Sequence, residues 1–263
     1  MKAIGVFDSG VGGLTVAREL MQQLPYEDIV YFGDTARVPY GTKSRETVFR
    51  FSIENILFLL KHDVKLICIA CNTASSVGLP AIKRHFKVPI VGVIGPGAKE
   101  AVYATRNKRI GVLGTRSTIK SRAYDIEIKQ LDRKAKVIAT ACPLFVPFVE
   151  EDWLNGKVVL EVARSYLKPL KDGRVDTAIL GCTHYPLLKP VIRKVLGKKV
   201  ILIDSARQVA MEVKKILAQD SQLNKKRVSR HRFYVSDNPE GFSKLAKRFL
   251  GSAVQNVKKV NSV

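Results

Sequence analysis

The chain has 263 residues, of which 46% are hydrophobic and 26% charged, and this globular balance excludes a disordered or fibrous protein. Lys and Arg outnumber Asp and Glu by 45 to 23, which gives a formal net charge of +22 and favours contact with nucleic acid or anionic surfaces. No apolar stretch reaches the roughly 18 residues of a membrane-spanning helix, and the N-terminus lacks a signal-peptide pattern, so we expect a cytoplasmic protein with no membrane contact.

Eight apolar, β-rich runs alternate with stretches of helical spacing along the chain. The runs are IGVFD, IVYFGD, LICIAC and PIVGVI (4–8, 29–34, 66–71, 89–94), then RIGVLGT, KVIATAC, DTAILGC and VILID (109–115, 136–142, 176–182, 200–204). Helices are predicted over 14–24, 75–86, 117–131 and 206–219. A further helix is predicted to begin after an N-cap at Ser44. Apolar strands alternating with helices indicate an α/β fold with buried parallel sheets.

The two halves of the chain share one spacing. The predicted strands end at 8, 34, 71 and 94, then at 115, 142, 182 and 204, so corresponding intervals agree within three residues. The local sequence is also similar in the two halves: IGVFDSG resembles IGVLGTR, and ICIACNTA resembles AILGCTHY. We therefore predict two pseudo-symmetric α/β domains with the active site in the cleft between them. The final helices and the strand-like 232–237 fit neither repeat, so the predicted domains are 1–96 plus 206–263, and 97–205.

Reactive side chains follow the strand ends, where open α/β sheets bind their ligands. They are Asp8 with Ser9, Asp34, Cys71 with Asn72 and Thr73, and Cys182 with Thr183 and His184. Cys71 and Cys182 occupy equivalent strand-to-helix junctions, where a helix N-terminus is expected to lower a thiol pKa from about 8.5 toward neutrality. Two such thiols, one from each half, suit a reaction that removes a Cα proton from one face and returns it to the other.

Other uses of the cysteines fit the sequence less well. Cys68 and Cys71 have the spacing of a redox pair, but residues three apart on a strand point to opposite faces. We therefore assign Cys68, and also Cys142, to the core. No zinc-ligand spacing, Schiff-base lysine motif, Walker motif or dinucleotide fingerprint occurs, so we expect neither a metal ion nor a cofactor.

Five motifs, in order along almost the whole chain, resemble those of glutamate racemase. They are DSGVGGLT at 8–15, GDTARVPYG at 33–41, IACNTA at 69–74, PLFVPFVE at 143–150 and GCTHYPLL at 181–188. The resemblance implies a cofactor-independent isomerase (EC 5.1.1.3) that interconverts L- and D-glutamate and supplies D-glutamate for peptidoglycan. It also implies a homo-oligomer, expected to be a dimer.

The resemblance assigns roles to individual residues. It implies that Cys71 acts on the D-enantiomer and Cys182 on the L-enantiomer, with Asp8, Glu150 and His184 assisting. The residues implied to hold the substrate are Asp8, Ser9, Tyr40, Gly41, Asn72, Thr73, Thr183 and His184. Residue chemistry alone leaves an aspartate or other amino-acid racemase of the same family open. From another class, the charge of +22 leaves open a basic nucleic-acid-binding protein, or nonspecific nucleic-acid binding as a secondary property.

Overall fold

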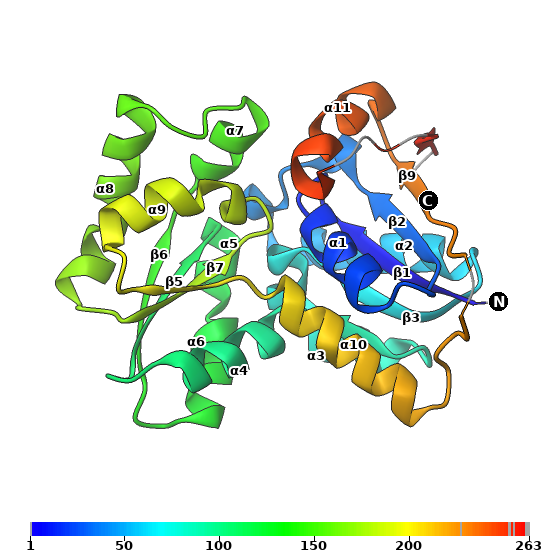
Figure 1. Ribbon diagram of the computed structural model, residues 1–263, viewed down its shortest axis with the longest axis horizontal. Coiled ribbons are helices and arrows are strands. Elements are labelled where there is room, and N and C mark those ends of the chain that lie inside the picture. The colour runs from blue at the N-terminus through cyan, green and yellow to red at the C-terminus, as the bar shows by residue number, and fades with distance from the viewer. Residues whose placement is uncertain (1, 227, 252–253, 255, 261–263) are drawn as a thin grey trace.

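Two parallel β-sheets lie side by side in the molecule, each with helices on both faces (Figure 1). The structure is a computed structural model that describes residues 2–226, 228–251, 254 and 256–260. The larger sheet has the strand order β10-β9-β2-β1-β3-β4 and the smaller one β6-β5-β7-β8. The prediction of two parallel-sheet α/β domains is therefore confirmed.

The elements follow the strand-helix alternation of the sequence. The first half holds β1 (Ala3–Asp8), α1 (Leu14–Gln23), β2 (Ile29–Gly33), α2 (Arg45–Leu60), β3 (Val64–Ile69), α3 (Asn72–His85), β4 (Ile90–Gly92) and α4 (Ile94–Ala104). The second holds β5 (Arg109–Gly114), α5 (Arg116–Ser121), α6 (Ala123–Leu131), β6 (Lys136–Ala141), α7 (Phe145–Glu150), α8 (Lys157–Asp172), β7 (Thr177–Gly181), α9 (Lys189–Leu196) and β8 (Ile201–Ile203). The rest is α10 (Ala206–Gln219), β9 (Arg232–Val235), α11 (Pro239–Leu250) and β10 (Lys258–Lys259). The described residues also form the short 3₁₀-helices η1 (Thr35–Arg37), η2 (Tyr40–Thr42) and η3 (Tyr185–Leu188).

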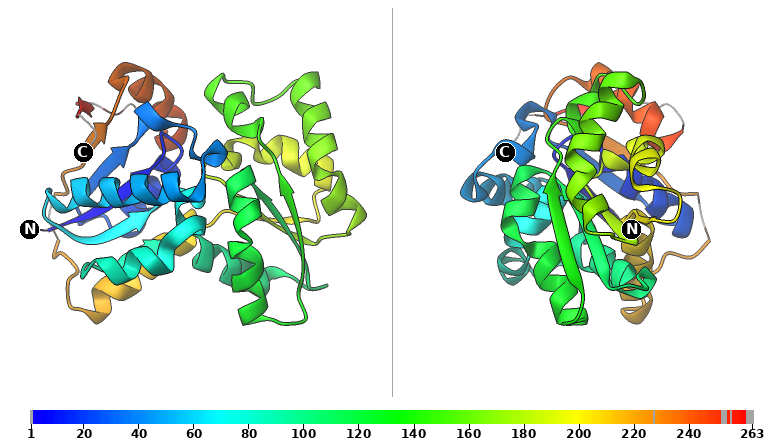
Figure 2. Two further views of the ribbon diagram at one scale, coloured as in Figure 1. Left: turned by 180° about the vertical axis from the view of Figure 1, so that it is seen from behind. Right: turned by 90° about the vertical axis from the view of Figure 1, so that its left-hand side faces the viewer.

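The internal repeat is visible in the order of the strands. In the first sheet the repeat strands run β2-β1-β3-β4, and in the second their counterparts run β6-β5-β7-β8, so each strand keeps its place. All pairings are parallel, which brings the carboxyl ends of β1 and β3, and of β5 and β7, to one edge of their sheets. The two sheets turn these edges toward each other (Figure 2), so both sets of reactive residues face the same interdomain region.

The C-terminal segment returns to the first sheet. Strand β9 pairs in parallel with β2, from Val30 opposite Arg232 to Gly33 opposite Val235, and α10 and α11 both contact α1. Asn224 lies in the segment that joins α10 to β9, and its backbone N–H donates to the Glu27 carboxylate at 2.8 Å. The same carboxylate forms a buried ion pair of 2.7 Å with Lys65, so this segment is held against the first domain. The bounds 1–96 plus 206–263 and 97–205 remain a prediction.

The helices differ from the predictions at several places. The single helix predicted over 117–131 is two helices, α5 and α6, because Arg122 takes a left-handed conformation with φ of 56°. The junction of the two halves contains α4, whose Pro96 lies in the first turn, where a missing N–H breaks no helical hydrogen bond. Helix α3 begins at Asn72, three residues before the predicted start, and α7, α8 and α9 were not predicted.

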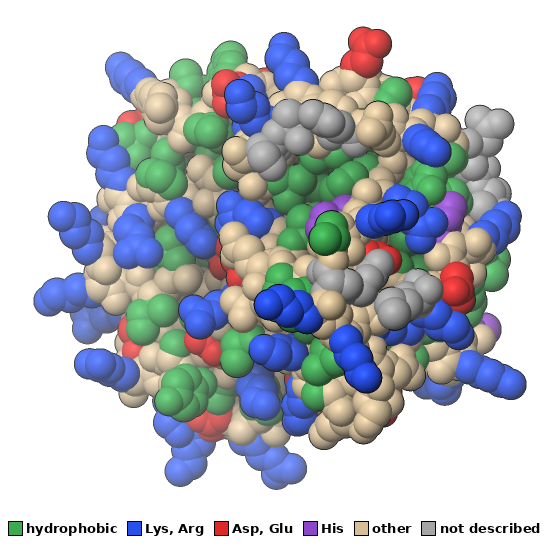
Figure 3. Space-filling model, turned by 45° about the vertical axis from the view of Figure 1, so that its right-hand side comes forward, with side chains coloured by type: hydrophobic (Ala, Val, Ile, Leu, Met, Phe, Trp, Pro, Cys, Tyr) green, Lys and Arg blue, Asp and Glu red, His purple; other side chains and the backbone are tan. Residues whose placement is uncertain are grey.

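The core consists of two clusters of buried side chains on opposite faces of the first sheet. Cys68 belongs to the cluster that extends into the second domain, and Cys71 to the cluster beneath α2 and α3, as the strand geometry predicts. None of the helices in the described residues combines the length and the apolar character that crossing a bilayer needs. Lys and Arg side chains are scattered over the whole visible face of the molecule, and acidic side chains are fewer there (Figure 3).

Candidate active site

Asp8 ends strand β1 and is fully buried. Its carboxyl oxygens accept hydrogen bonds from the backbone N–H of Gly10 at 3.0 Å and from the Thr183 hydroxyl at 3.4 Å. Burial raises the pKa of Asp8, and the charge of nearby His184 and these hydrogen bonds offset the rise only in part. Helix α1 has no side-chain cap, so Asp8 is not the N-cap of the helix that follows it. The hydrogen bond with Thr183 shows that the Asp8 carboxyl group lies where the two sheets meet.

Cys71 follows β3 and is the N-cap residue of α3. Its sulfur accepts a hydrogen bond from the backbone N–H of Ala74 at 3.5 Å, and its thiol donates to the Ser9 hydroxyl at 3.8 Å. The expectation of a lowered pKa is wrong for this residue, because burial and then the charge of Asp8 raise the pKa of Cys71 to about 12. One weak N–H···S contact does not replace the water that the thiolate loses in a closed site.

Cys182 follows β7 and begins a chain of three acid–base groups. Its sulfur lies 3.9 Å from Nδ1 of His184, whose Nε2 lies 3.1 Å from the Glu150 carboxylate. Burial lowers the pKa of His184, but the hydrogen bonds and charges of Cys182 and Glu150 outweigh this and raise it to about 10. The ring is therefore protonated at neutral pH. The element that follows Cys182 is the 3₁₀-helix η3 rather than an α-helix, so its junction is equivalent to that of Cys71 in position but not in local structure.

Both thiols line one small cavity between the two sheets. Its volume is about 20 Å³, which is room for about one water molecule. The walls are formed by Ser9, Val38, Pro39, Tyr40, Gly41, Cys71, Asn72 and Thr73 from the first half and by Thr115, Val146, Cys182, Thr183 and His184 from the second. A dicarboxylic amino acid is far larger than one water molecule, so the walls must separate before such a ligand enters.

Polar contacts between the two domains hold the cavity closed. The Thr73 and Thr115 hydroxyls lie 2.9 Å apart, and the Tyr124 hydroxyl donates to Oδ1 of Asn72 at 2.7 Å. Water can replace each of these hydrogen bonds when the domains part, so breaking them costs little net free energy. The closed state therefore brings the thiols together without preventing ligand entry.

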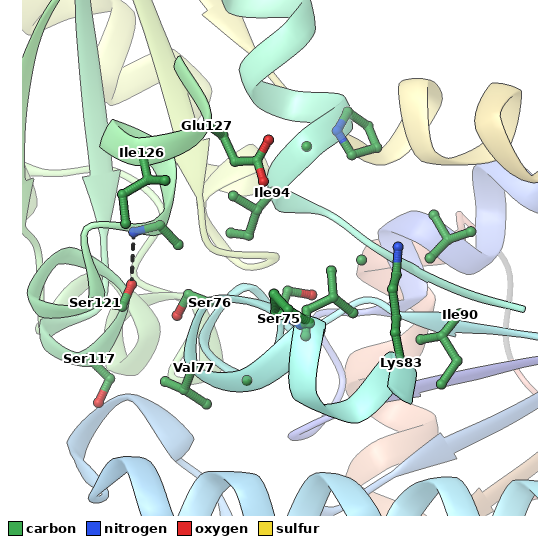
Figure 4. A pocket seen from close by; sticks show the side chains of 18 of the residues that line it. Ser75, Ser76, Val77, Lys83, Ile90, Ile94, Ser117, Ser121, Ile126 and Glu127 are labelled. Atoms are coloured by element: carbon green, nitrogen blue, oxygen red, sulfur yellow. Dashed lines mark hydrogen bonds between the residues drawn. The ribbon is translucent and has the colours of Figure 1, made fainter. Parts of the chain in front are cut away.

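A larger cavity of about 890 Å³ also lies between the two domains, lined by Ser76 and Val77 of α3 and by Ser117 and Ser121 of α5 (Figure 4). Its charged lining residues are Lys43, Arg45, Lys83, Lys99, Lys120, Glu127, Glu212 and Lys215. Neither Cys71 nor Cys182 lines it. Because the thiols and their acid–base partners gather at the small cavity, we place the active site there.

The structure brings the predicted site residues together. All of them line the small cavity except Asp8 and Glu150, which contact the wall residues Thr183 and His184. Four further wall residues were missed: Val38, Pro39, Thr115 and Val146. The sequence carried a signal for Thr115, because aligning IGVFDSG with IGVLGTR places it opposite Ser9. Asp34 does not line the cavity.

The groups at the cavity are those of acid–base chemistry. The four cysteines of the chain are all unpaired and buried, and Cys68 and Cys142 lie in the core, as assigned from the sequence. In the described part of the chain, no cluster of three or more His, Cys, Asp or Glu side chains has the geometry to hold a metal ion. Two thiols that face one small space, one beside Asp8 and one beside His184, can exchange protons with a molecule bound between them.

Comparisons with known proteins agree with this chemistry. The family model of Asp/Glu/hydantoin racemases matches residues 4–213. A glutamate racemase of Geobacter metallireducens is 50% identical over 261 residues, which cover 99% of this chain and 97% of that protein. The crystal structure of a glutamate racemase isoform from Bacillus anthracis superposes with a TM-score of 0.94 at 41% identity, again covering 99% and 97% of the two chains. The glutamate racemase of Francisella tularensis in complex with D-glutamate gives 0.93 at 39% identity with the same coverage.

Proposed function

The chain belongs to the Asp/Glu/hydantoin racemase family, and on this premise we propose that it interconverts L- and D-glutamate with Cys71 and Cys182 as its two acid–base groups. The observation that carries the proposal is that equivalent strands of the two repeats, β3 and β7, each present a thiol to one cavity. The relatives that share 39% to 50% of the sequence are glutamate racemases, which favours glutamate over aspartate. The resemblance to glutamate racemases implies that the D-glutamate supplies peptidoglycan synthesis.

Racemisation breaks the Cα–H bond on one face of the substrate and forms a new one on the other. From L-glutamate, the Cys182 thiolate takes the Cα proton and becomes a thiol, while the Cys71 thiol gives its proton to the opposite face and becomes a thiolate. From D-glutamate the roles are exchanged. No cofactor takes part. Each turnover leaves the two sulfurs in exchanged protonation states, and exchange with solvent restores them.

The neighbours of the thiols support these protonation states. The His184 ring, with its raised pKa, carries a positive charge at neutral pH, and its Nδ1 lies 3.9 Å from the Cys182 sulfur. Among the described residues Cys71 has no such cationic neighbour, and burial and then the charge of Asp8 raise its pKa. The ammonium group of a bound substrate placed beside Asp8 neutralises that carboxylate and removes its effect on Cys71. Substrate binding thereby lowers the barrier to ionising Cys71.

The rest of the site suits the substrate. Hydroxyls and backbone N–H groups bind carboxylates well. Ser9, Thr73 and Thr183 offer the hydroxyls, Asn72 an amide, and the segment containing Tyr40 and Gly41 its backbone. A polarimetric assay without added cofactor tests the proposal. We expect racemisation of both glutamate enantiomers and far slower reaction of L-aspartate; no reaction of glutamate, or equal rates for aspartate, would contradict it.

A pH profile tests the role of His184. We expect kcat of the wild-type enzyme to fall on the alkaline side as His184 loses its proton near pH 10, because the Cys182 thiolate then loses its cationic neighbour. His184→Asn should lower kcat by about 10² and remove this limb. The quantity to follow is kcat, because the ammonium of free glutamate also titrates at high pH and affects kcat/KM. Glu150→Gln should give a weaker effect of the same sign, and an unchanged profile in His184→Asn would remove His184 from the acid–base chain.

We further propose that the enzyme is a cytoplasmic homodimer whose charge of +22 attracts nucleic acid nonspecifically. Basic side chains spread over a whole face favour such attraction rather than a defined nucleic-acid site (Figure 3). Binding of this kind falls steeply with salt. Sedimentation velocity should show a mass of two chains, with a DNA duplex comigrating at about 50 mM salt but not at about 200 mM. A monomer, or DNA binding that ignores salt, would contradict the respective proposal.

A further inference from the structure

The side chain of Tyr40 connects the active-site cavity to a buried carboxylate that the mechanism does not use. Tyr40 lies in the wall segment 38–41, yet its side chain is almost completely buried and its ring contacts Phe51, with centroids 5.6 Å apart. Its hydroxyl donates to Oδ2 of Asp34 and accepts from Nδ2 of Asn55 at 3.0 Å. The phenol thus anchors the wall segment to residues outside the cavity.

Asp34 is fully buried, and both of its oxygens are occupied. Besides the Tyr40 hydroxyl, Oδ2 accepts from Nε of Arg37 at 2.7 Å. The other oxygen, Oδ1, accepts from the Ser236 hydroxyl at 3.0 Å, and Ser236 in turn accepts from the backbone N–H of Ala36 at 2.8 Å. A buried carboxylate is stable only when such partners satisfy it, so the partners and the carboxylate fix one another in place.

Arg37 closes the network on its outer side. Its guanidinium forms an ion pair with Glu54, donates to Oδ1 of Asn55 at 3.1 Å and lies over the Phe51 ring at 3.9 Å. Asn55 therefore accepts from Arg37 through Oδ1 and donates to the Tyr40 hydroxyl through Nδ2, which fixes the orientation of its amide. Burial also raises the pKa of Tyr40 far above its usual range, so the phenol remains a donor at every working pH.

The cavity side of the segment has little room for movement. Gly41 follows Tyr40 directly, and a Cβ atom at this position would lie only 2.6 Å from Cβ of Thr115 in the other domain. The Thr115 hydroxyl lies 2.9 Å from the hydroxyl of Thr73, which is two residues after Cys71. A shift of the 38–41 backbone by a fraction of an ångström therefore changes the space between the two domains at the point where the substrate must be held.

We propose that Asp34 is a positioning residue, which holds the cavity wall at 38–41 in place through its hydrogen bond with the Tyr40 hydroxyl. The proposal rests on the proposed function of the site. Asp34 does not line the cavity, so it acts through Tyr40 and not on the substrate. Because Ser236 follows β9 directly, the C-terminal segment that lies outside both repeats contributes to the anchor.

The test is a double-mutant cycle of Tyr40→Phe and Asp34→Asn, read in glutamate racemisation. Each single substitution should lower kcat/KM about tenfold, mainly through a higher KM, because the wall segment binds substrate but transfers no proton. The double variant should lose no more than the worse single variant. Tyr40→Phe removes the phenol donor, and Asp34→Asn leaves a single acceptor oxygen for the Tyr40, Arg37 and Ser236 donors, so both disrupt the same network. Its pH profile should keep the wild-type shape. Calorimetric titration with D-glutamate should show the same weakening without relying on turnover.

Tyr234→Phe is the matched control, because Tyr234, on strand β9, is also a buried tyrosine, but its ring contacts Phe58 and His62. It should change kcat/KM less than twofold. A wild-type KM in either single variant would overturn the proposal, and so would losses of kcat/KM that multiply in the double variant. So would a fall in activity that matches a loss of folded protein at unchanged KM. If the wild-type enzyme itself fails to racemise glutamate, the proposed function fails instead.

Discussion

Cys71→Ser and Cys182→Ser are each expected to lower kcat/KM for glutamate racemisation by about 10³ or more, with the fold intact. A serine hydroxyl is a much weaker acid than a thiol, so it can neither ionise to take the Cα proton nor hold a proton of suitable acidity. Both cysteines are buried and unpaired, and serine is slightly smaller, so the substitution fits the space. At position 71 the serine hydroxyl can still accept from the backbone N–H of Ala74, which keeps the cap of α3.

Cys142→Ser is the matched control for this experiment. Cys142 is also buried beside the second sheet, and its thiol donates to the backbone carbonyl of Thr140 at 3.9 Å, a contact that a serine hydroxyl can retain. It should leave kcat/KM within about threefold of the wild-type value, a change of well under 1 kcal/mol. Thermal unfolding measured for all three variants separates lost chemistry from lost structure. Turnover near the wild-type rate in either Cys71→Ser or Cys182→Ser would remove the two-thiol mechanism.

The sequence predicted the sheets well because buried parallel strands have a simple pattern. Runs such as IGVFD and DTAILGC are apolar throughout, and strand ends predicted at 8 and 182 lie within one residue of the observed ones. The repeat of spacing then predicted two related domains, and the identical strand order shows why it occurs. The N-cap at Ser44 was also predicted from local sequence, because serine is a preferred N-cap residue. In the structure its hydroxyl accepts from the backbone N–H of Thr47.

The features that were missed depend on contacts between distant parts of the chain. The break between α5 and α6 at Arg122 has no Gly or Pro to signal it. The raised pKa of Cys71 comes from burial and then from the charge of Asp8, which a local helix-dipole argument does not include. Ser236 reaches Asp34 across 202 positions, so no sequence spacing reveals the anchor of Tyr40. Strand ends identify reactive residues, but only the closed fold shows what surrounds them.

The fate of the Cα hydrogen in heavy water tests the central claim most directly. Starting from unlabelled L-glutamate, the Cys182 thiolate removes protium, while the Cys71 thiol, already exchanged with solvent, delivers deuterium to the opposite face. Early D-glutamate should therefore carry deuterium at Cα while the remaining L-glutamate carries almost none, and starting from D-glutamate should give the mirror result. NMR of both enantiomers at low conversion makes the measurement. Substantial protium in the early product, or equal labelling of product and recovered substrate, would contradict transfer by Cys71 and Cys182 from opposite faces.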